Sequence, residues 1–124
     1  AVRHSSRPNL YRHPGAVARL DYVLDEFERL AGAHDFVPVV LFIPDPSDLR
    51  RFTQGQATRY QGYVATYRAR TAGTKVVVLD LLEHSFEAAR FNRRPFKDHP
   101  SPYGQQVIAD VMRETIAPLL PPRP

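Results

Sequence analysis

The sequence predicts an incomplete α/β fold, a three-layer α/β/α arrangement with parallel strands. Two short and continuously apolar runs, at 36–43 and 75–79, are typical of strands covered on both faces of a parallel sheet. Segments with apolar residues at three- and four-residue steps alternate with these runs and indicate amphipathic helices. Two strands joined by a helix form a right-handed parallel unit. Because two strands alone bury little surface, we expect further strands from another stretch of polypeptide.

Length and composition are those of a single globular domain. The 124 residues are 43% hydrophobic, carry a net charge of +4 and include no cysteine, which excludes disulfides and cysteine catalysis. The basic residues are scattered, apart from the pairs Arg50-Arg51 and Arg93-Arg94, so we expect no nucleic-acid partner. No run is long enough to span a membrane as a helix. The composition leaves the compartment open.

The first half of the chain is expected to contain a tail, a long helix, a strand and a short helical turn. Residues 1–15 lack periodicity and are expected to form a tail or connecting loop before a domain at 16–120. The helix is predicted from Ala16 to Gly32, where glycine favours a stop. The strand at 36–43 ends at Pro44-Asp45-Pro46, after which Ser47 is predicted to cap a short turn reaching Phe52.

The second half repeats this alternation and ends in a helix with a clear start. A tyrosine stripe predicts a helix at 57–72 ended by Gly73, and we expect it to pack on the sheet rather than stack on bases. Asp80 ends the strand at 75–79 and is read as the N-cap of a helix at 81–90. A polar loop at 91–100 follows. Ser101 and Pro102 then predict the start of the last helix, and 121–124 form a second tail.

His99 is the candidate for chemistry that the residues themselves offer. It precedes a helix start in a polar loop, and an imidazole suits general-base catalysis because its unperturbed pKa lies near neutrality. A loop histidine near a helix cap is the alternative interpretation. His84 and Glu87, three residues apart, have a spacing that can ligate metal on a helix, but without an evident third ligand a solvated helix face is favoured. We therefore expect no metal and no cofactor.

The segment Asp98-His99-Pro100-Ser101-Pro102-Tyr103-Gly104-Gln105-Gln106-Val107-Ile108-Ala109 resembles the closing motif of the SGNH/GDSL hydrolase superfamily. Upstream, 39–45 resembles a strand of that family ending in proline, and 76–82 resembles its next strand with an Asp-Leu ending. The similarity covers about 16–119, which corresponds to the C-terminal half of a usual family member. It implies a flavodoxin-like three-layer fold, of which this chain holds one part.

The resemblance implies that His99 is the base for a serine nucleophile and that a carboxylate orients its ring. The family places this carboxylate two or three residues before the histidine, where this chain has Lys97 and Phe96. Asp98 is therefore the candidate orienting residue, and a backbone carbonyl is the alternative. Neither a Gly-Asp-Ser block nor a Gly-x-Asn-Asp block exists in the sequence. The 124 residues alone are thus expected to be inactive as an esterase.

Two classes of function remain open. The first is the C-terminal part of an SGNH-type serine ester hydrolase, or of an O-acyltransferase acting on a glycan, completed by a missing N-terminal half or another chain along the sheet edge. Its substrate would be a small ester or an O-acetylated glycan. Arg93, Arg94 and Lys97 are either contacts for an anionic substrate or a solvated basic loop. The second class is a non-catalytic SGNH-like binding module.

Overall fold

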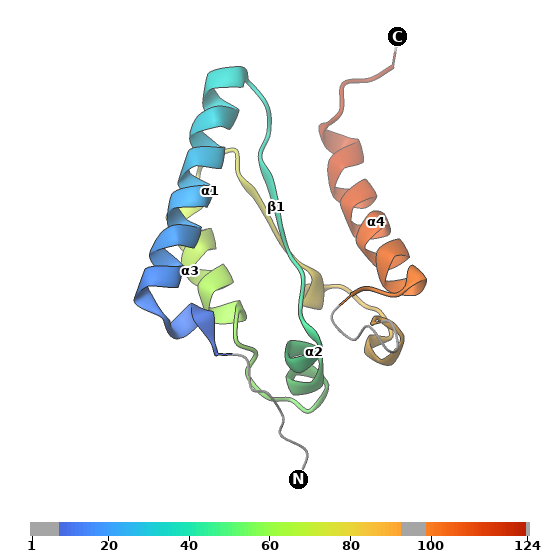
Figure 1. Cartoon of the computed structure of the whole chain (residues 1–124). Coiled ribbons are helices and arrows are strands. Elements are labelled where there is room, and N and C mark those ends of the chain that lie inside the picture. Colours follow the sequence, from blue (N-terminus) through green and yellow to red (C-terminus); the bar gives the residue numbers. More distant parts are fainter. Residues whose placement is uncertain (1–7, 93–98, 124) are drawn as a thin grey trace. The chain divides into compact units, whose positions relative to one another are not determined.

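The computed structural model describes residues 8–92 and 99–123 and has α/β character, with four α-helices and a two-stranded parallel sheet in that part of the chain (Figure 1). Four short 3-10 helices (η1–η4) connect or extend these elements. In chain order the elements are η1 (Leu10–Arg12), α1 (Pro14–His34), β1 (Val39–Phe42), α2 (Pro46–Thr53), α3 (Gln61–Thr71), β2 (Val77–Asp80), η2 (Leu81–Glu83), η3 (Ala88–Arg90), α4 (Pro102–Ile116) and η4 (Ala117–Leu119).

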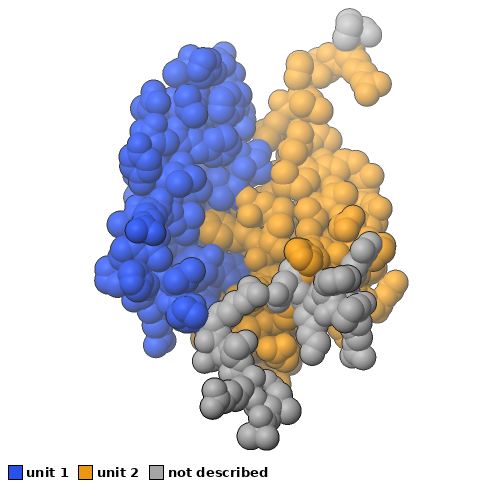
Figure 2. All heavy atoms as spheres, viewed as in Figure 1, with its two compact units in different colours: residues 1–40, 59–78 blue, residues 41–58, 79–124 orange. Residues whose placement is uncertain are grey.

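The chain divides into two compact units, which Figure 2 colours separately. Unit 1 comprises Ala1–Val40 and Arg59–Val78, and unit 2 comprises Leu41–Thr58 and Leu79–Pro124. Unit 1 therefore contains η1, α1 and α3 with the first residues of both strands. Unit 2 contains the last residues of both strands together with α2, η2, η3, α4 and η4.

Helix α1 confirms the predicted first helix and extends it at both ends. It begins two residues earlier because Pro14 occupies its first turn, while the side chain of His13 accepts a hydrogen bond from the Ala16 N–H at 3.1 Å. The helix continues through Gly32 and ends where Asp35 adopts a left-handed conformation with φ of 53°. The sequence signal for a stop at Gly32 is thus overridden by a cap three residues later.

The parallel pairing of the two strands is confirmed, and both strands are shorter than predicted. The Val77 N–H donates to the carbonyl of Pro38 at 2.9 Å, so the pairing begins beside the proline. Phe36 and Val37, predicted as strand, precede it and are 40% and 42% exposed. Within unit 1, an Arg68 nitrogen donates to the Val78 carbonyl at 3.2 Å and ties α3 to β2.

Two local predictions in unit 2 are wrong. The cap of α2 is Asp45, whose carboxylate accepts from the Asp48 N–H at 2.8 Å, and not Ser47, which already lies inside the helix. The helix predicted at 81–90 is replaced by η2 and η3, because His84 and Glu87 have extended backbones with ψ of 152° and 100°. Periodicity alone could not reveal this break, since Leu81, Leu82 and Phe91 are all buried although no continuous helix carries them.

Each unit has its own set of buried side chains. In unit 1 these are Leu24, Ala31, Tyr60, Val64, Tyr67 and Thr71. In unit 2 the buried apolar residues are Phe42, Leu49, Leu81, Leu82, Phe91 and Val111. Two of the predicted stripe tyrosines are thus core residues, which supports the packing interpretation of that stripe.

Candidate functional site

His99 lies in unit 2, immediately before the last helix, and its side chain is exposed. Ser101, two residues further on, is the N-cap of α4: its hydroxyl oxygen accepts from the Gly104 N–H at 3.0 Å, and Pro102 occupies the first helical turn. The predicted helix start, and the position of His99 just ahead of it, agree with the structure. Asp98, the candidate orienting carboxylate, lies outside the described residues, as do Arg93, Arg94 and Lys97.

The backbone that follows His99 is bonded to η3. The Ser101 N–H donates to the Phe91 carbonyl at 2.7 Å, and the Ser101 hydroxyl donates to the Arg90 carbonyl. Pro100 forms an isolated antiparallel bridge with Asn92. The described residues 90–92 and 100–101 are therefore paired with each other, and His99 lies directly before this pairing.

Tyr103, in the first turn of α4, makes two further contacts with the η3 region. Its hydroxyl oxygen accepts from the Glu87 N–H at 2.9 Å. The Arg90 guanidinium carbon lies 4.1 Å from the centre of the Tyr103 ring, in cation–π geometry, and an Arg90 nitrogen lies 3.5 Å from a Glu87 carboxylate oxygen. One aromatic side chain thus holds both the backbone and a side chain of the opposite segment.

Gly104 completes this contact because it has no Cβ. A Cβ built at Gly104 would overlap the Phe91 carbonyl oxygen and lie 3.1 Å from the Cβ of Pro100. Phe91 itself is fully buried and packs its ring 5.3 Å from that of Phe86. We call the described residues Glu87, Arg90, Phe91, Ser101, Tyr103 and Gly104 the loop anchor.

The carboxylates at or just after the ends of the two strands, Asp80 and Asp45, cap the helices that follow. Asp80 is 2% exposed and accepts from the Leu82 N–H at 3.0 Å, which confirms its interpretation as an N-cap. Asp45 does the same for α2. His84 and Glu87 lie between η2 and η3 rather than along one helix, so the spacing argument for a metal site fails. Across 8–92 and 99–123 no group of three potential metal-ligating side chains comes together.

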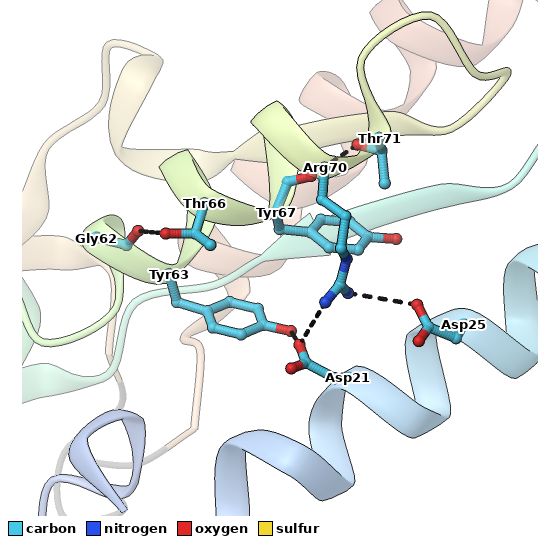
Figure 3. Close-up of polar contacts among 8 residues, drawn as sticks. All are labelled: Asp21, Asp25, Gly62, Tyr63, Thr66, Tyr67, Arg70 and Thr71. Atoms are coloured by element: carbon cyan, nitrogen blue, oxygen red, sulfur yellow. Dashed lines mark hydrogen bonds and ion pairs between the residues drawn. The ribbon is translucent and has the colours of Figure 1, made fainter. Parts of the chain in front are cut away.

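Sequence reasoning missed a polar network in unit 1 that joins α1 to α3 (Figure 3). The Tyr63 hydroxyl donates to an Asp21 carboxylate oxygen at 2.5 Å, and an Arg70 nitrogen lies 3.0 Å from the same oxygen. A second Arg70 nitrogen lies 3.4 Å from Asp25, and the guanidinium carbon lies 5.2 Å from the Tyr67 ring centre. Asp21 and Asp25 are one turn apart on α1, and Tyr63, Tyr67 and Arg70 follow one another at helical spacing on α3, which is the signal that could have revealed it.

This network shifts the pKa values of its members in opposite directions. The hydrogen bond from Tyr63 is the main cause that holds the pKa of Asp21 below its usual range, and Arg70 adds to it. Burial is the main cause that raises the pKa of Tyr63, and the hydrogen bond to Asp21 raises it further. One guanidinium, that of Arg70, pairs with the carboxylates of both Asp21 and Asp25, and such a network of ion pairs and hydrogen bonds is typical of a structural role.

Unit 1 also has a hollow of about 240 Å³ between the end of α1 and the start of the strands. Phe36, Pro38 and Val76 supply apolar lining, while Lys75 and Asp35 are 3.9 Å apart and 80% and 96% exposed. An ion pair this exposed contributes little. The described lining of this hollow contains no nucleophile beside a base and no histidine.

No helix in the part of the chain that the structure describes is long and apolar enough to cross a membrane. Comparisons with protein-family models, with curated proteins and with solved structures found no match to the chain.

Proposed function

We propose that this chain is the C-terminal part of an SGNH-type serine ester hydrolase, in which His99 is the general base. The observation that carries the proposal is an exposed imidazole whose following backbone is bonded to η3 just ahead of the α4 N-cap. A base that acts on a substrate must be accessible and held in place, and an exposed histidine beside a fixed helix start satisfies both conditions.

The proposed reaction needs a serine from a stretch of polypeptide that this sequence does not contain. An imidazole nitrogen of His99 accepts the serine hydroxyl proton while the serine oxygen forms a bond to the ester carbonyl carbon. The protonated imidazole then returns that proton to the departing alcohol as the ester C–O bond breaks. Water hydrolyses the acyl-serine in the same way, with His99 again accepting and then donating one proton.

The scaffold we propose is a flavodoxin-like three-layer α/β/α domain that is completed along the edge of the β1–β2 sheet by the missing N-terminal half. Its support is that the strand residues at 39–41 and 77–79, all apolar, are only half-buried. Residues of this type in a parallel sheet are normally covered on both faces. An edge strand with unpaired backbone groups is also a template for another strand.

Asp98 is proposed to orient the His99 ring, because it is the acidic residue next to it in the sequence. A carboxylate in that role fixes the imidazole tautomer and stabilises its protonated form. The substrate class is a small ester or an O-acetylated glycan. Transfer of the acyl group to a glycan hydroxyl instead of water would use the same steps and would make the protein an O-acyltransferase.

The test is an acyl-ester assay on the full-length protein that carries this chain, comparing the parent with His99→Ala and His34→Ala. His34 is exposed on the last turn of α1 in unit 1 and serves as a matched histidine control. Removing the base of a nucleophile–base pair should lower kcat by at least about a thousandfold. A fluorophosphonate probe should label the parent and His34→Ala, and label His99→Ala far more slowly.

Turnover of His99→Ala within about tenfold of the parent, or a full-length protein without ester turnover, would contradict the hydrolase proposal. The non-catalytic binding module would then be the better interpretation. That alternative is favoured by two features of the sequence, the absence of a Gly-Asp-Ser block and the displaced position of the carboxylate Asp98.

A further inference from the structure

We infer that Tyr103 and Gly104 are positioning residues for His99, acting through the loop anchor. This inference rests on the proposed function only in its catalytic consequence. The immobilisation of His99 by the loop anchor can be measured on the present chain, and this measurement does not require esterase activity. The contacts that position His99 lie within unit 2 and are made by described residues.

The first step is that the anchor fixes the backbone two residues after His99 from several directions. Ser101 is bonded to η3 through its N–H and its hydroxyl, to the carbonyls of Phe91 and Arg90. Pro100, adjacent to His99, is paired with Asn92. Proline has a restricted φ, so His99 precedes a residue with little freedom and is itself restricted to extended conformations.

The second step is that these bonds depend on a close approach that only glycine permits. The Phe91 carbonyl accepts from Ser101 at 2.7 Å and at the same time occupies the space that a Gly104 side chain would need. An alanine at 104 would push that carbonyl, which belongs to backbone and not to a flexible side-chain end, away from α4. The Ser101 hydrogen bond would lengthen with it.

The third step is that Tyr103 reinforces the same contact independently. Its hydroxyl accepts from the Glu87 N–H at 2.9 Å, and its ring lies 4.1 Å from the Arg90 guanidinium carbon. Phenylalanine keeps the ring and loses the acceptor, whereas leucine loses both. The two variants therefore separate the hydrogen bond from the stacking contact, and phenylalanine should retain most of the function.

The consequence is a specific demand on catalysis. A general base must be held within about 0.5 Å of its productive position, and a displacement of about 1 Å can cost about a hundredfold in rate. A loosened anchor should thus lower kcat and leave KM unchanged, since no residue of the anchor is assigned to substrate binding. A variant that merely destabilised the fold would reduce the amount of folded protein and would leave the dynamics of His99 in that protein unaltered.

The experiment measures 15N relaxation and amide hydrogen exchange in the present chain for Gly104→Ala, Tyr103→Phe and Tyr103→Leu. Gly62→Ala is the matched control, because nothing lies within 4 Å of a Cβ at Gly62. The order parameter of the His99 amide should fall from about 0.8 to below about 0.6 in Gly104→Ala and Tyr103→Leu. Exchange of the Ser101 amide should accelerate at least tenfold, while Tyr103→Phe and Gly62→Ala should resemble the parent.

An unchanged His99 order parameter in Tyr103→Leu, in protein that is folded by its far-UV spectrum, would overturn the inference even if Gly104→Ala failed to fold. In the full-length protein, Gly104→Ala and Tyr103→Leu should lower kcat by about ten- to a hundredfold with KM within twofold. If His99 is immobilised by the anchor but no ester turnover exists, the hydrolase proposal fails and the positioning inference stands. If turnover needs His99 but is insensitive to both anchor variants, the hydrolase proposal stands and the positioning inference fails.

Discussion

Some single residues in this chain have structural roles that cannot be predicted from the residue type alone. Asp21, on the surface of α1, accepts a hydrogen bond from the hydroxyl of Tyr63, 42 positions away in sequence, and pairs with Arg70, so that it links α1 to α3. Gly104 lies against the backbone carbonyl of Phe91, so close that a side chain would not fit, although it lies inside a helical pattern. In both cases the decisive partner is remote in sequence, which is why local patterns did not reveal it.

Replacing Asp21 with Asn should destabilise the chain at neutral pH by about 1 kcal/mol, because the Tyr63 hydroxyl then donates to a neutral acceptor and the ion pair with Arg70 is lost at a partly exposed site. The lowered pKa of Asp21 means that its contribution is complete above the unfolded value of 3.8 and is lost as pH falls through the folded pKa. The raised pKa of Tyr63 means that its contribution is complete below 10.0 and is lost as pH rises further. Urea unfolding as a function of pH should show both losses of stability in the parent. In Asp21→Asn the acid loss due to Asp21 should disappear, whereas the alkaline loss due to Tyr63 should become smaller and persist, because burial is its main cause. A free energy of unfolding that is lower in Asp21→Asn than in the parent by the same amount at every pH would contradict this prediction.

Two glycine-to-alanine substitutions should have opposite effects on stability. Gly62→Ala, in α3 with open space around the new methyl group, should stabilise by about 0.5–1 kcal/mol because alanine has the higher helix propensity. Gly104→Ala should destabilise by about 1–3 kcal/mol because the methyl group overlaps the Phe91 carbonyl. Thermal unfolding of the two variants checks the sign. A stabilised Gly104→Ala would show that Phe91 can move away at no cost.

At the scale of elements, sequence patterns predicted what periodicity and caps determine. The helices α1 and α4, both parallel strands and the Ser101 cap were predictable because their signals lie within a few residues of each other. The segment at 81–90 was not, since His84 and Glu87 have extended backbones that no local sequence signal indicated. For the candidate site, the position of His99 before α4 was predictable from Ser101-Pro102. The anchor was not, because Tyr103 and Gly104 contact residues 87–91, whose helix was wrongly predicted.

The cap of α2 offers a direct test of one such difference. Asp45→Ala should lower the free energy of unfolding by about 1 kcal/mol, because the Asp48 N–H loses its acceptor and a favourable charge leaves the helix start. Ser47→Ala should change it by less than about 0.5 kcal/mol, as expected of a substitution away from a cap. Chemical denaturation of the two variants is sufficient. The opposite ranking would restore Ser47 as the functional cap.

At the scale of the whole molecule, the described sheet has two strands whose apolar side chains are partly exposed. Six apolar strand residues, at 39–41 and 77–79, are only half-buried. A two-stranded sheet needs cover or partners to be independently stable. We therefore predict that the present chain self-associates reversibly, or forms a stable complex with the N-terminal half, through the sheet edge.

Sedimentation velocity over a range of concentrations checks this prediction. The sedimentation coefficient should rise with concentration, and Val40→Lys should reduce that rise because a charged strand residue discourages pairing. Val23→Lys, at a 59%-exposed position on α1, is the control and should show the same rise of the sedimentation coefficient as the parent. A concentration-independent monomer with slowly exchanging strand amides would contradict the prediction.

The division into two units has a consequence for how the molecule can be made or cut. The chain passes between the units at 40/41, 58/59 and 78/79, so neither unit is a continuous stretch. During synthesis, unit 1 stays incomplete until residue 78 has left the ribosome. By then residues 41–58 of unit 2 have already emerged, without the rest of that unit. No single truncation yields either unit alone, and one proteolytic nick between residues 41 and 78 leaves both units with chain from each side of the cut. Expression of either half as a gene fragment should consequently give unfolded polypeptide, whereas mixing fragments cut at 54–58 offers the best prospect of reconstitution.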